Sequence, residues 1–372
     1  RMKILLLSCS TGEGHNHCAL AVKESLEARG HETEFLDMLH MFSEPGPLSF
    51  DKVLNRISSK TPELFGMMYH AGAMYSATGV TSPVYLANIR HARQLNEFIT
   101  ERGYDAVVCS HLFPMETLTF LRRHERCAVR CYGVLSDYTC IPFLAETDLT
   151  WYFLPHEEVR TACVEAGMPP ERLFVTGMPV AAKFKAEMTR DDARAELDLP
   201  VDKKIYLIMT GGIGCGDAIS LCDAIRRVPD ENSLLCVLPG RNEELRAALE
   251  ARYAGHGVMA VPFTDKVAAY MHACDVLLSK AGGISSSEAA VLGVPLVHTM
   301  AIPGVETLNA QFFADHGMSY FAQNVDEAAR FADRLIYDNA ASDRMLTAQR
   351  TCLAKDGAER IAERIEAENA DA

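Results

Sequence analysis

Glycine-rich turns that precede helical stretches are the places in this sequence best suited to chemistry. One turn ends at Gly14, a second ends at Gly216, and a third is formed by Gly282 and Gly283. The first N–H groups of a helix have no partner within the helix and the helix dipole is positive there, so a helix start favours an anion. The sequence therefore predicts that phosphate groups bind at helix starts.

The third turn lies in residues 280–289, Lys-Ala-Gly-Gly-Ile-Ser-Ser-Ser-Glu-Ala, which follow a strand-like apolar run. Paired glycines let the backbone approach a diphosphate closely. The Ser285 hydroxyl can donate to the same group, and Glu288, one turn into the helix, can accept from ribose hydroxyls. The alternative is a capping box with Ser285 or Ser286 as the N-cap residue and Glu288 as its partner.

Motifs for other chemistry are absent from the sequence. It contains no Gly-x-Gly-x-x-Gly dinucleotide motif, no Gly-x-x-x-x-Gly-Lys phosphate loop and no Gly-x-Ser-x-Gly nucleophile elbow. It offers no Cys-x-x-Cys pair and no Asp-x-Asp motif to hold a metal ion. These absences argue against a dehydrogenase, a P-loop NTPase and a serine hydrolase, and we expect no metal or other cofactor.

Apolar runs that alternate with helical stretches must position these turns. Strands are predicted over residues 4–9, 32–36, 106–109, 129–134 and 173–176, and again over 204–209, 234–238, 257–261, 276–279 and 295–298. Helices are predicted over 18–29, 89–102 and 218–227, among others. Such alternation is typical of a parallel, doubly wound sheet, and the restart at residue 204 predicts two α/β domains. Prolines place the boundary between residues 177 and 200.

Length and composition agree with two globular domains. The chain has 372 residues, of which 48% are hydrophobic and 23% charged, with a net charge of −14. This acidic balance argues against a protein that coats nucleic acid. The twelve cysteines lie mostly in apolar settings and are expected to be reduced. No apolar run reaches 18 residues, so we expect a cytoplasmic protein without a membrane-spanning helix.

Residues 46–96 reverse the overall charge. Aromatic residues and methionines crowd this segment, and its charges sum to 5 − 2 = +3. The combination is typical of a segment that lies on an anionic membrane surface. A Met-rich core helix with a solvated basic face is the alternative. The charged residues are Lys52, Arg56, Lys60, Arg90 and Arg93 against Asp51 and Glu63.

Segments spread over nearly the whole chain resemble one protein family. The segment 280–289 is followed by Gly293-Val294-Pro295, Ile302-Pro303-Gly304, Glu306 and Asn309-Ala310; upstream lie Thr11–His15, Phe113–Met115, Ser136–Tyr138, Thr176–Val180 and Met209–Gly214. In this order the segments resemble glycosyltransferase family 28. Within that family the likeness is to the processive diacylglycerol glucosyltransferases and the monogalactosyldiacylglycerol synthases.

The resemblance implies a fold and an activity. The implied fold is the glycosyltransferase-B architecture, an α/β fold of two Rossmann-like doubly wound domains that face each other across a cleft. Residues 1–180 are then the N-terminal lipid-acceptor and membrane-facing domain, residues 181–357 the C-terminal UDP-sugar-binding domain, and residues 358–372 a tail helix that packs back on the first domain. The implied activity is inverting transfer of a hexose, glucose or galactose, from a UDP-sugar to diacylglycerol. It would need no metal and would take place on the inner face of a bacterial membrane.

The resemblance also implies roles for individual residues. His15 matches the family's loop histidine and is expected to act as general base or to bind the diphosphate; Asp137 and Glu13 are rivals for the base, and His111 is a weaker one. The residues expected to bind the donor are Gly212, Gly214, Phe263, Lys280, Gly282, Gly283, Ile284, Ser285, Glu288, Glu306 and Asn309. Those expected to contact the acceptor or the membrane are Lys52, Arg56, Lys60, Phe65, Tyr69, Phe113 and Pro114.

Three positions depart from the family pattern. Ala181 stands where close relatives usually carry Arg, Val305 where they carry Gln, and Ala281 where they carry Pro. The first two bear on phosphate and sugar contacts, so glucose and galactose both stay open as the transferred sugar. Two other functions are alternatives: transfer of N-acetylglucosamine to a polyprenyl-linked cell-wall precursor, and non-catalytic sensing of a UDP-sugar.

Overall fold

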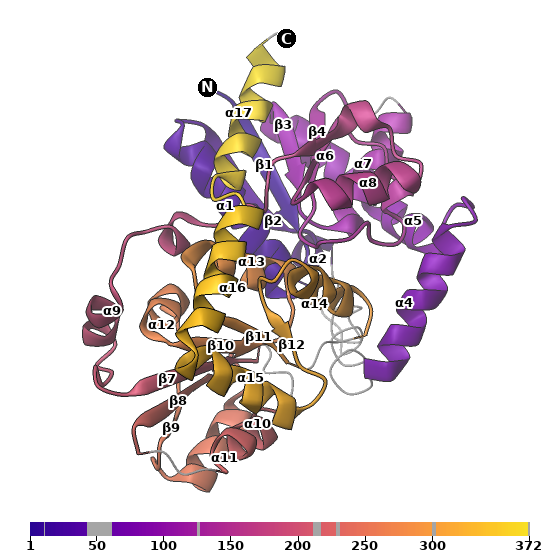
Figure 1. The fold of residues 1–372 in the computed structure, drawn as a ribbon. Helices are drawn as coiled ribbons and strands as arrows, with labels where there is room; N and C mark the ends of the chain where they lie inside the picture. The colour runs from indigo at the N-terminus through magenta and orange to yellow at the C-terminus, as the bar shows by residue number, and fades with distance from the viewer. Residues whose placement is uncertain are drawn as a thin grey trace. The chain divides into compact units, whose positions relative to one another are not determined.

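The alternating strands and helices build two parallel sheets of six strands each (Figure 1). The structure is a computed structural model that describes residues 1–10, 12–42, 62–124, 127–210, 217–227, 231–299 and 303–370. Every strand pairing in both sheets is parallel. The predicted pair of doubly wound α/β sheets is therefore confirmed.

The first sheet has the strand order β2-β1-β3-β4-β5-β6. Strand β1 is a continuous apolar run because both faces of a parallel sheet are covered, and its side chains from Ile4 to Leu7 are fully buried. The order reverses between β1 and β3, and doubly wound sheets bind ligands beyond the carboxyl ends of their strands at such a switch point. The strands are β1 (Lys3–Ser8), β2 (Glu32–Asp37), β3 (Ala106–Cys109), β4 (Arg130–Val134), β5 (Trp151–Leu154) and β6 (Leu173–Val175).

The helices that accompany this sheet include the C-terminal one. Glu366 of that helix binds Arg29 at 2.6 Å and His31 at 2.7 Å, which ties the end of the chain to its beginning. Figure 1 shows the same helix, in yellow, beside α1. The helices are α1 (Glu13–Ala28), α2 (Met38–Phe42), α4 (Pro62–Ser76), α5 (Pro83–Asn88), α6 (Ala92–Arg102), α7 (Leu112–Arg123), α8 (Glu157–Glu165) and α17 (Gly357–Ala370).

The second sheet has the order β12-β11-β10-β7-β8-β9, with its switch point between β10 and β7. The buried Asp275 accepts from Arg194 at 3.0 Å and from the backbone N–H of Ile205 at 2.8 Å, which ties α9 to the sheet. The strands are β7 (Lys204–Met209), β8 (Ser233–Leu238), β9 (Val258–Ala260), β10 (Val276–Ser279), β11 (Leu296–His298) and β12 (Tyr320–Phe321). The helices are α9 (Arg190–Glu196), α10 (Ala218–Ile225), α11 (Glu243–Tyr253), α12 (Val267–Ala273), α13 (Gly283–Leu292), α14 (Val305–Asp315), α15 (Val325–Tyr337) and α16 (Asn339–Cys352).

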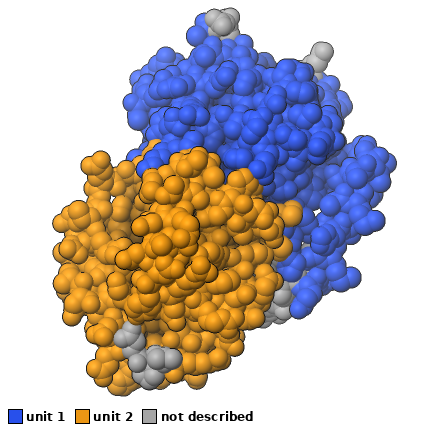
Figure 2. All heavy atoms as spheres, in the orientation of Figure 1, with its two compact units in different colours: residues 1–182, 303–305, 354–372 blue, residues 183–302, 306–353 orange. Residues whose placement is uncertain are grey.

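The chain divides into two compact units, one around each sheet (Figure 2). Unit 1 consists of residues 1–182, 303–305 and 354–372, and unit 2 of residues 183–302 and 306–353. The helix α17 therefore belongs to unit 1, although it follows unit 2 in the sequence.

Three details differ from the sequence-based expectations or add to them. The first helix begins at Glu13 rather than near residue 18, so Gly14 and His15 lie inside its first turn. The short strands β5 and β12 were not predicted. Among the described residues, no helix is both long and apolar enough to cross a membrane, and the cysteines are free thiols.

Candidate functional site

His15 lies in the first turn of α1, beyond the carboxyl end of β1. Its Nδ1 atom is 2.9 Å from the carbonyl oxygen of Ser110 and 2.9 Å from the hydroxyl oxygen of Ser136. A carbonyl oxygen can only accept, so Nδ1 carries the proton and Nε2 of the neutral ring carries the lone pair. The Ser110 hydroxyl donates in turn to the backbone carbonyl of His15 at 2.8 Å. These bonds fix the ring with Nε2 as its basic atom.

Ser136 connects this imidazole to a carboxylate. Its hydroxyl accepts from Nδ1–H of His15 and donates to Oδ2 of Asp137 at 3.5 Å. A carboxylate at the end of such a chain stabilises the positive charge that forms when Nε2 takes up a proton. The structure therefore brings Asp137 to the Nδ1 side of the ring. Glu13, the other predicted rival, is the first residue of α1 and is half-buried.

A second histidine lies beside the first. The rings of His15 and His111 meet edge to face with 4.5 Å between their centres. His111 caps α7, because its Nδ1 accepts the backbone N–H of Phe113 at 3.1 Å. Burial, together with His15, holds the pKa of His111 well below its ordinary value. The neutral ring of His111 is thus a wall of the site. The ring of Phe113, a predicted acceptor residue, lies 4.6 Å from the His111 ring, and Pro114, the next residue of α7, is buried.

Tyr69 of α4 lies near Asp137. Burial raises the pKa of the Tyr69 hydroxyl to about 12, and the charge of Asp137 contributes to the rise. Tyr69 shares the inward face of α4 with Gly66 and Gly72. A Cβ atom at Gly66 would lie 2.5 Å from the Cβ atom of Pro303, so the helix packs this closely only because the residue is glycine.

The outward face of α4 carries the large apolar side chains. Met67 is 70% exposed and Met74 is 76% exposed, although apolar side chains of this size are usually buried. The helix therefore departs from an ordinary surface helix, because large apolar side chains lie on its outward face while two glycines lie on its inward face. The same exposed face includes Leu64, Met68 and Tyr75.

Part of the predicted membrane and donor surfaces lies outside the described residues. This applies to Lys52, Arg56 and Lys60, to the side chain of Phe65, and to Gly212 and Gly214. Of the basic residues that are described, Arg93 pairs with Glu97 at 2.9 Å and Arg90 is exposed.

In unit 2, α13 begins without a side-chain cap. Gly282 is its N-cap residue, and no side chain in the described part of the chain caps its first turn. The Ser285 hydroxyl donates to the carbonyl of Gly282 at 3.4 Å, and the Ser286 hydroxyl bonds to His298 at 2.8 Å. The capping box that the sequence allowed is not formed. The backbone N–H groups of Gly283 and Ile284 remain suited to an anion.

The three predicted helix starts are not equivalent. At α10 the side chain of Asp217 accepts the N–H of Ser220 at 2.9 Å, so a carboxylate already occupies the place of an anion. The starts of α1 and α13 both have glycine as the N-cap residue. These two starts have no side-chain cap within the described residues, which leaves their N–H groups suited to a phosphate.

The predicted sugar-binding residues of α14 are tied to the turn before α13. Lys280 Nζ lies 2.7 Å from Oε1 of Glu306. The amide nitrogen of Asn309 donates to the carbonyl of Ala281 at 3.1 Å, and Asn309 is fully buried. Glu288 is also buried, one turn into α13. This arrangement places Glu306 beside the turn and makes Asn309 an anchor of its backbone.

His298, the last residue of β11, connects α13 to the segment just before β12. Its Nε2 lies 2.8 Å from the hydroxyl of Ser286 and its Nδ1 lies 3.1 Å from that of Ser319. Burial lowers the pKa of His298 to about 3, so the ring is neutral at physiological pH. His298 thus fixes the second turn of α13 relative to β11.

The predicted donor residue Phe263 is 55% exposed at the end of β9. The guanidinium of Arg241, which follows β8, lies 4.5 Å from the centre of its ring. An exposed aromatic ring held by a cation offers a flat face of the kind on which a nucleobase stacks.

Sequence reasoning assigned no role to several residues of the site. Ser110 follows directly after the predicted strand 106–109, Ser136 lies two residues beyond the predicted strand 129–134, and His298 ends the strand predicted over 295–298. Polar residues just beyond strand ends at a switch point are the signal that would have found them.

Two family models match the chain. Residues 15–180 match the monogalactosyldiacylglycerol (MGDG) synthase family, and residues 227–365 match the glycosyltransferase family 28 C-terminal domain. A processive diacylglycerol beta-glucosyltransferase of Bacillus pumilus is 24% identical over 368 residues, which cover 98% of this chain and 94% of the relative. The resemblance predicted from the sequence is therefore confirmed.

Solved structures show the fold. S. aureus MnaA, solved with UDP, covers 99% of this chain and 97% of its own length at a TM-score of 0.65 and 14% identity. MurG of Acinetobacter baumannii covers 99% and 100% at a TM-score of 0.61 and 15% identity. The chain has the same two-domain α/β fold, the glycosyltransferase-B class that the sequence predicted.

Proposed function

We propose that this chain, which joins an MGDG-synthase-type half to a family 28 half, is an inverting hexosyltransferase that moves glucose or galactose from a UDP-sugar to diacylglycerol. The observation that carries the proposal is the 2.9 Å contact between Nδ1 of His15 and the Ser110 carbonyl, because a proton on Nδ1 leaves the lone pair on Nε2. A transferase that inverts by direct displacement needs such a base at the acceptor hydroxyl.

In the proposed reaction the acceptor hydroxyl attacks C1 of the hexose. Nε2 of His15 takes the hydroxyl proton, the new C1–O bond forms, and the bond from C1 to the diphosphate oxygen breaks. The electron pair of that bond leaves with UDP, whose charge the N–H groups at the start of α13 stabilise. The resulting imidazolium is stabilised through Ser136 and Asp137. Glu306 would bind sugar hydroxyls, and the ring of Phe263 would stack on the nucleobase of UDP.

The outward face of α4 is proposed to contact the membrane that holds the acceptor. Burying Met67 and Met74 in a bilayer removes apolar surface from water at about 25 cal/mol per Å². Exposed Arg90 and the basic residues Lys52, Arg56 and Lys60 add attraction to anionic lipid.

One assay tests the activity and the sugar. The protein is incubated with diacylglycerol vesicles and with radiolabelled UDP-glucose, UDP-galactose or UDP-N-acetylglucosamine, and the lipid products are separated. Labelled glycolipid with glucose or galactose is expected. Transfer of N-acetylglucosamine alone, or UDP-sugar binding with no product, contradicts the proposal.

Vesicle sedimentation tests the membrane face. The double variant Met67→Ser/Met74→Ser is expected to be retained several-fold less than the wild type by anionic vesicles. Val201, which is 63% exposed in unit 2, offers a matched control, because Val201→Ser removes exposed apolar surface from another unit. Equal retention of all three proteins contradicts the assignment.

A further inference from the structure

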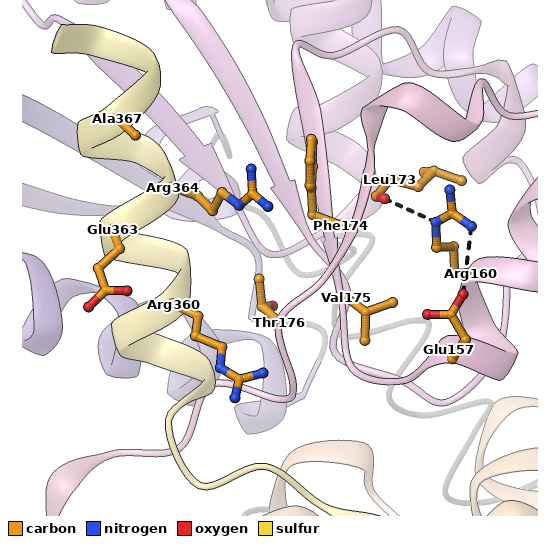
Figure 3. A pocket seen from close by; sticks show the side chains of 10 residues that line it. All are labelled: Glu157, Arg160, Leu173, Phe174, Val175, Thr176, Arg360, Glu363, Arg364 and Ala367. Atoms are coloured by element: carbon orange, nitrogen blue, oxygen red, sulfur yellow. Dashed lines mark hydrogen bonds and ion pairs between the residues drawn. The ribbon is translucent and has the colours of Figure 1, made fainter.

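A groove in unit 1 has a different character from the site around His15. It encloses about 600 Å³ between α17, β6 and α8, a volume within the range of small-molecule sites (Figure 3). The edge strand β6 forms its floor with Leu173, Phe174 and Val175, and Thr176 follows. The groove therefore offers an apolar surface at the free edge of the sheet.

Three arginines line this groove. Figure 3 shows Arg360 and Arg364 extending from α17 toward β6, one helical turn apart, and Arg160 on the side of α8. Of the acidic residues that line the groove, Glu157 pairs with Arg160 at 3.6 Å within it, and Glu363 lies 3.5 Å from Arg29. The wall formed by α17 is thus cationic.

Arg364 is the arginine whose charge is not matched. Its guanidinium lies 4.5 Å from the centre of the Phe174 ring, and it makes no ion pair within the described residues. Arg360 pairs with the exposed Asp356 just before α17, at 3.0 Å. An exposed pair of this kind contributes little energy, so Arg360 can exchange it for another anion.

We propose that this groove binds a phosphate-bearing anion through Arg360 and Arg364. Arg360 and Arg364 lie one helical turn apart on α17, and each guanidinium is a planar fork that matches the oxygens of a phosphate. The apolar floor suits an organic group attached to that phosphate. The inference does not depend on the proposed transferase activity, because it uses none of the residues assigned to it.

The position of the groove gives binding a consequence for the fold. Thr176 leads directly into Gly177, which packs against the start of α17. A Cβ atom at Gly357 would lie 2.4 Å from the carbonyl oxygen of Met178, so these two segments are in tight contact. An anion that holds α17 against β6 therefore stabilises the place where the chain leaves unit 1 and returns to it.

The chain carries its own probe for this site. Trp151 is the single tryptophan, and its ring lies 4.7 Å from that of Phe174. Movement of Arg364 from Phe174 toward an anion should change Trp151 fluorescence. The protein is titrated with inorganic phosphate, with glycerol 3-phosphate, and with phosphatidylcholine vesicles with or without phosphatidylglycerol. Each series includes Arg360→Gln, Arg364→Gln and, as a control, Arg330→Gln, which removes an exposed arginine of α15.

A saturable fluorescence change is expected in the wild type and in Arg330→Gln, with at least tenfold weaker binding in Arg360→Gln and Arg364→Gln. A response to the soluble phosphates identifies a free metabolite as the source, and a response only to phosphatidylglycerol vesicles identifies a lipid headgroup. Melting temperatures of each variant without anion show that the fold is kept. Arg360→Gln, which loses only an exposed pair, keeps the test decisive if Arg364→Gln unfolds. The proposal is overturned if no anion gives a saturable change, or if the arginine variants respond like the wild type.

Discussion

The starts of α1 and α13 both consist of a strand, a glycine and a helix, but their usable chemical groups differ. Each helix follows a parallel strand at the switch point of its sheet, and each has glycine as its N-cap residue. The first turn of α1 carries an imidazole whose ring is held from the ends of two other strands. The first turn of α13 carries Gly283 and Ile284, so its usable groups are backbone N–H.

This difference separates two kinds of site. At α1 the chemistry resides in a side chain, so truncating that side chain should remove it and leave the fold intact. At α13 the chemistry resides in the backbone, which no truncation can remove. Only a new group placed over the N–H groups should block it.

Replacing His15 should have the largest effect. His15→Ala removes the base and is expected to lower kcat about 100-fold or more, because positioned general bases contribute about 10²–10⁴. Transfer of labelled hexose under saturating donor is the measurement. His17→Ala, two residues along the same helix, is the control and should keep most of the activity. A folded His15→Ala protein with nearly normal turnover would refute the claim that the His15 side chain supplies the chemistry at the start of α1.

The proposed role of the backbone N–H groups at the start of α13 is tested by adding a side chain there. Gly282→Asp supplies an N-cap carboxylate like that of Asp217 at α10, and its negative charge should weaken UDP binding by tenfold or more. Gly282→Asn has nearly the same shape and caps almost as well without the charge, so it should bind UDP better than the Asp variant. Calorimetric titration with UDP measures both. If the two variants bind UDP equally, charge at the helix start is not what matters.

How much the sequence predicts differs between these sites. The start of a helix at the Gly282-Gly283 pair was predicted, because a glycine pair after an apolar run is a local signal. The strands 106–109, 204–209 and 276–279 were also predicted to the residue, since buried parallel strands are continuous apolar runs.

What the sequence did not predict is the support from distant segments. Ser110 and Ser136 contact His15 from 95 and 121 residues away, and such contacts depend on the order of strands in the sheet. The two faces of α4 also escaped prediction, because its inward glycines Gly66 and Gly72 are explained only by their distant neighbours Pro303 and Phe143. The short strand β12 is two residues long and gives no periodic signal.

A double-mutant cycle sharpens the description of the α1 site. Ser136→Ala breaks the connection between His15 and Asp137, and Asp137→Asn removes the charge at its end. Each is expected to lower kcat about tenfold, in the range found for partners that orient a functional histidine. Because both changes interrupt one chain, the double variant should be little slower than either single variant. Fully multiplicative losses would mean that the two residues act separately.

The last prediction compares one buried titratable group in each unit by its effect on how the melting temperature depends on pH. We expect this effect to be the smallest. Burial, with the charge of Glu146 adding to it, raises the pKa of Glu116 in unit 1 from 4.5 to about 10. Between these values the folded protein keeps a proton that the unfolded chain has released, so this group makes stability fall as pH rises. Burial lowers the pKa of His298 in unit 2 from 6.5 to about 3, so below pH 6.5 the unfolded chain binds the extra proton and stability falls as pH falls. Melting curves are recorded at pH 5 and pH 8.5. Compared with the wild type, Glu116→Gln should lose less melting temperature as the pH rises, and His298→Gln should lose less as the pH falls. If either substitution leaves the pH dependence of the melting temperature unchanged, the buried group it replaces does not titrate as its surroundings predict.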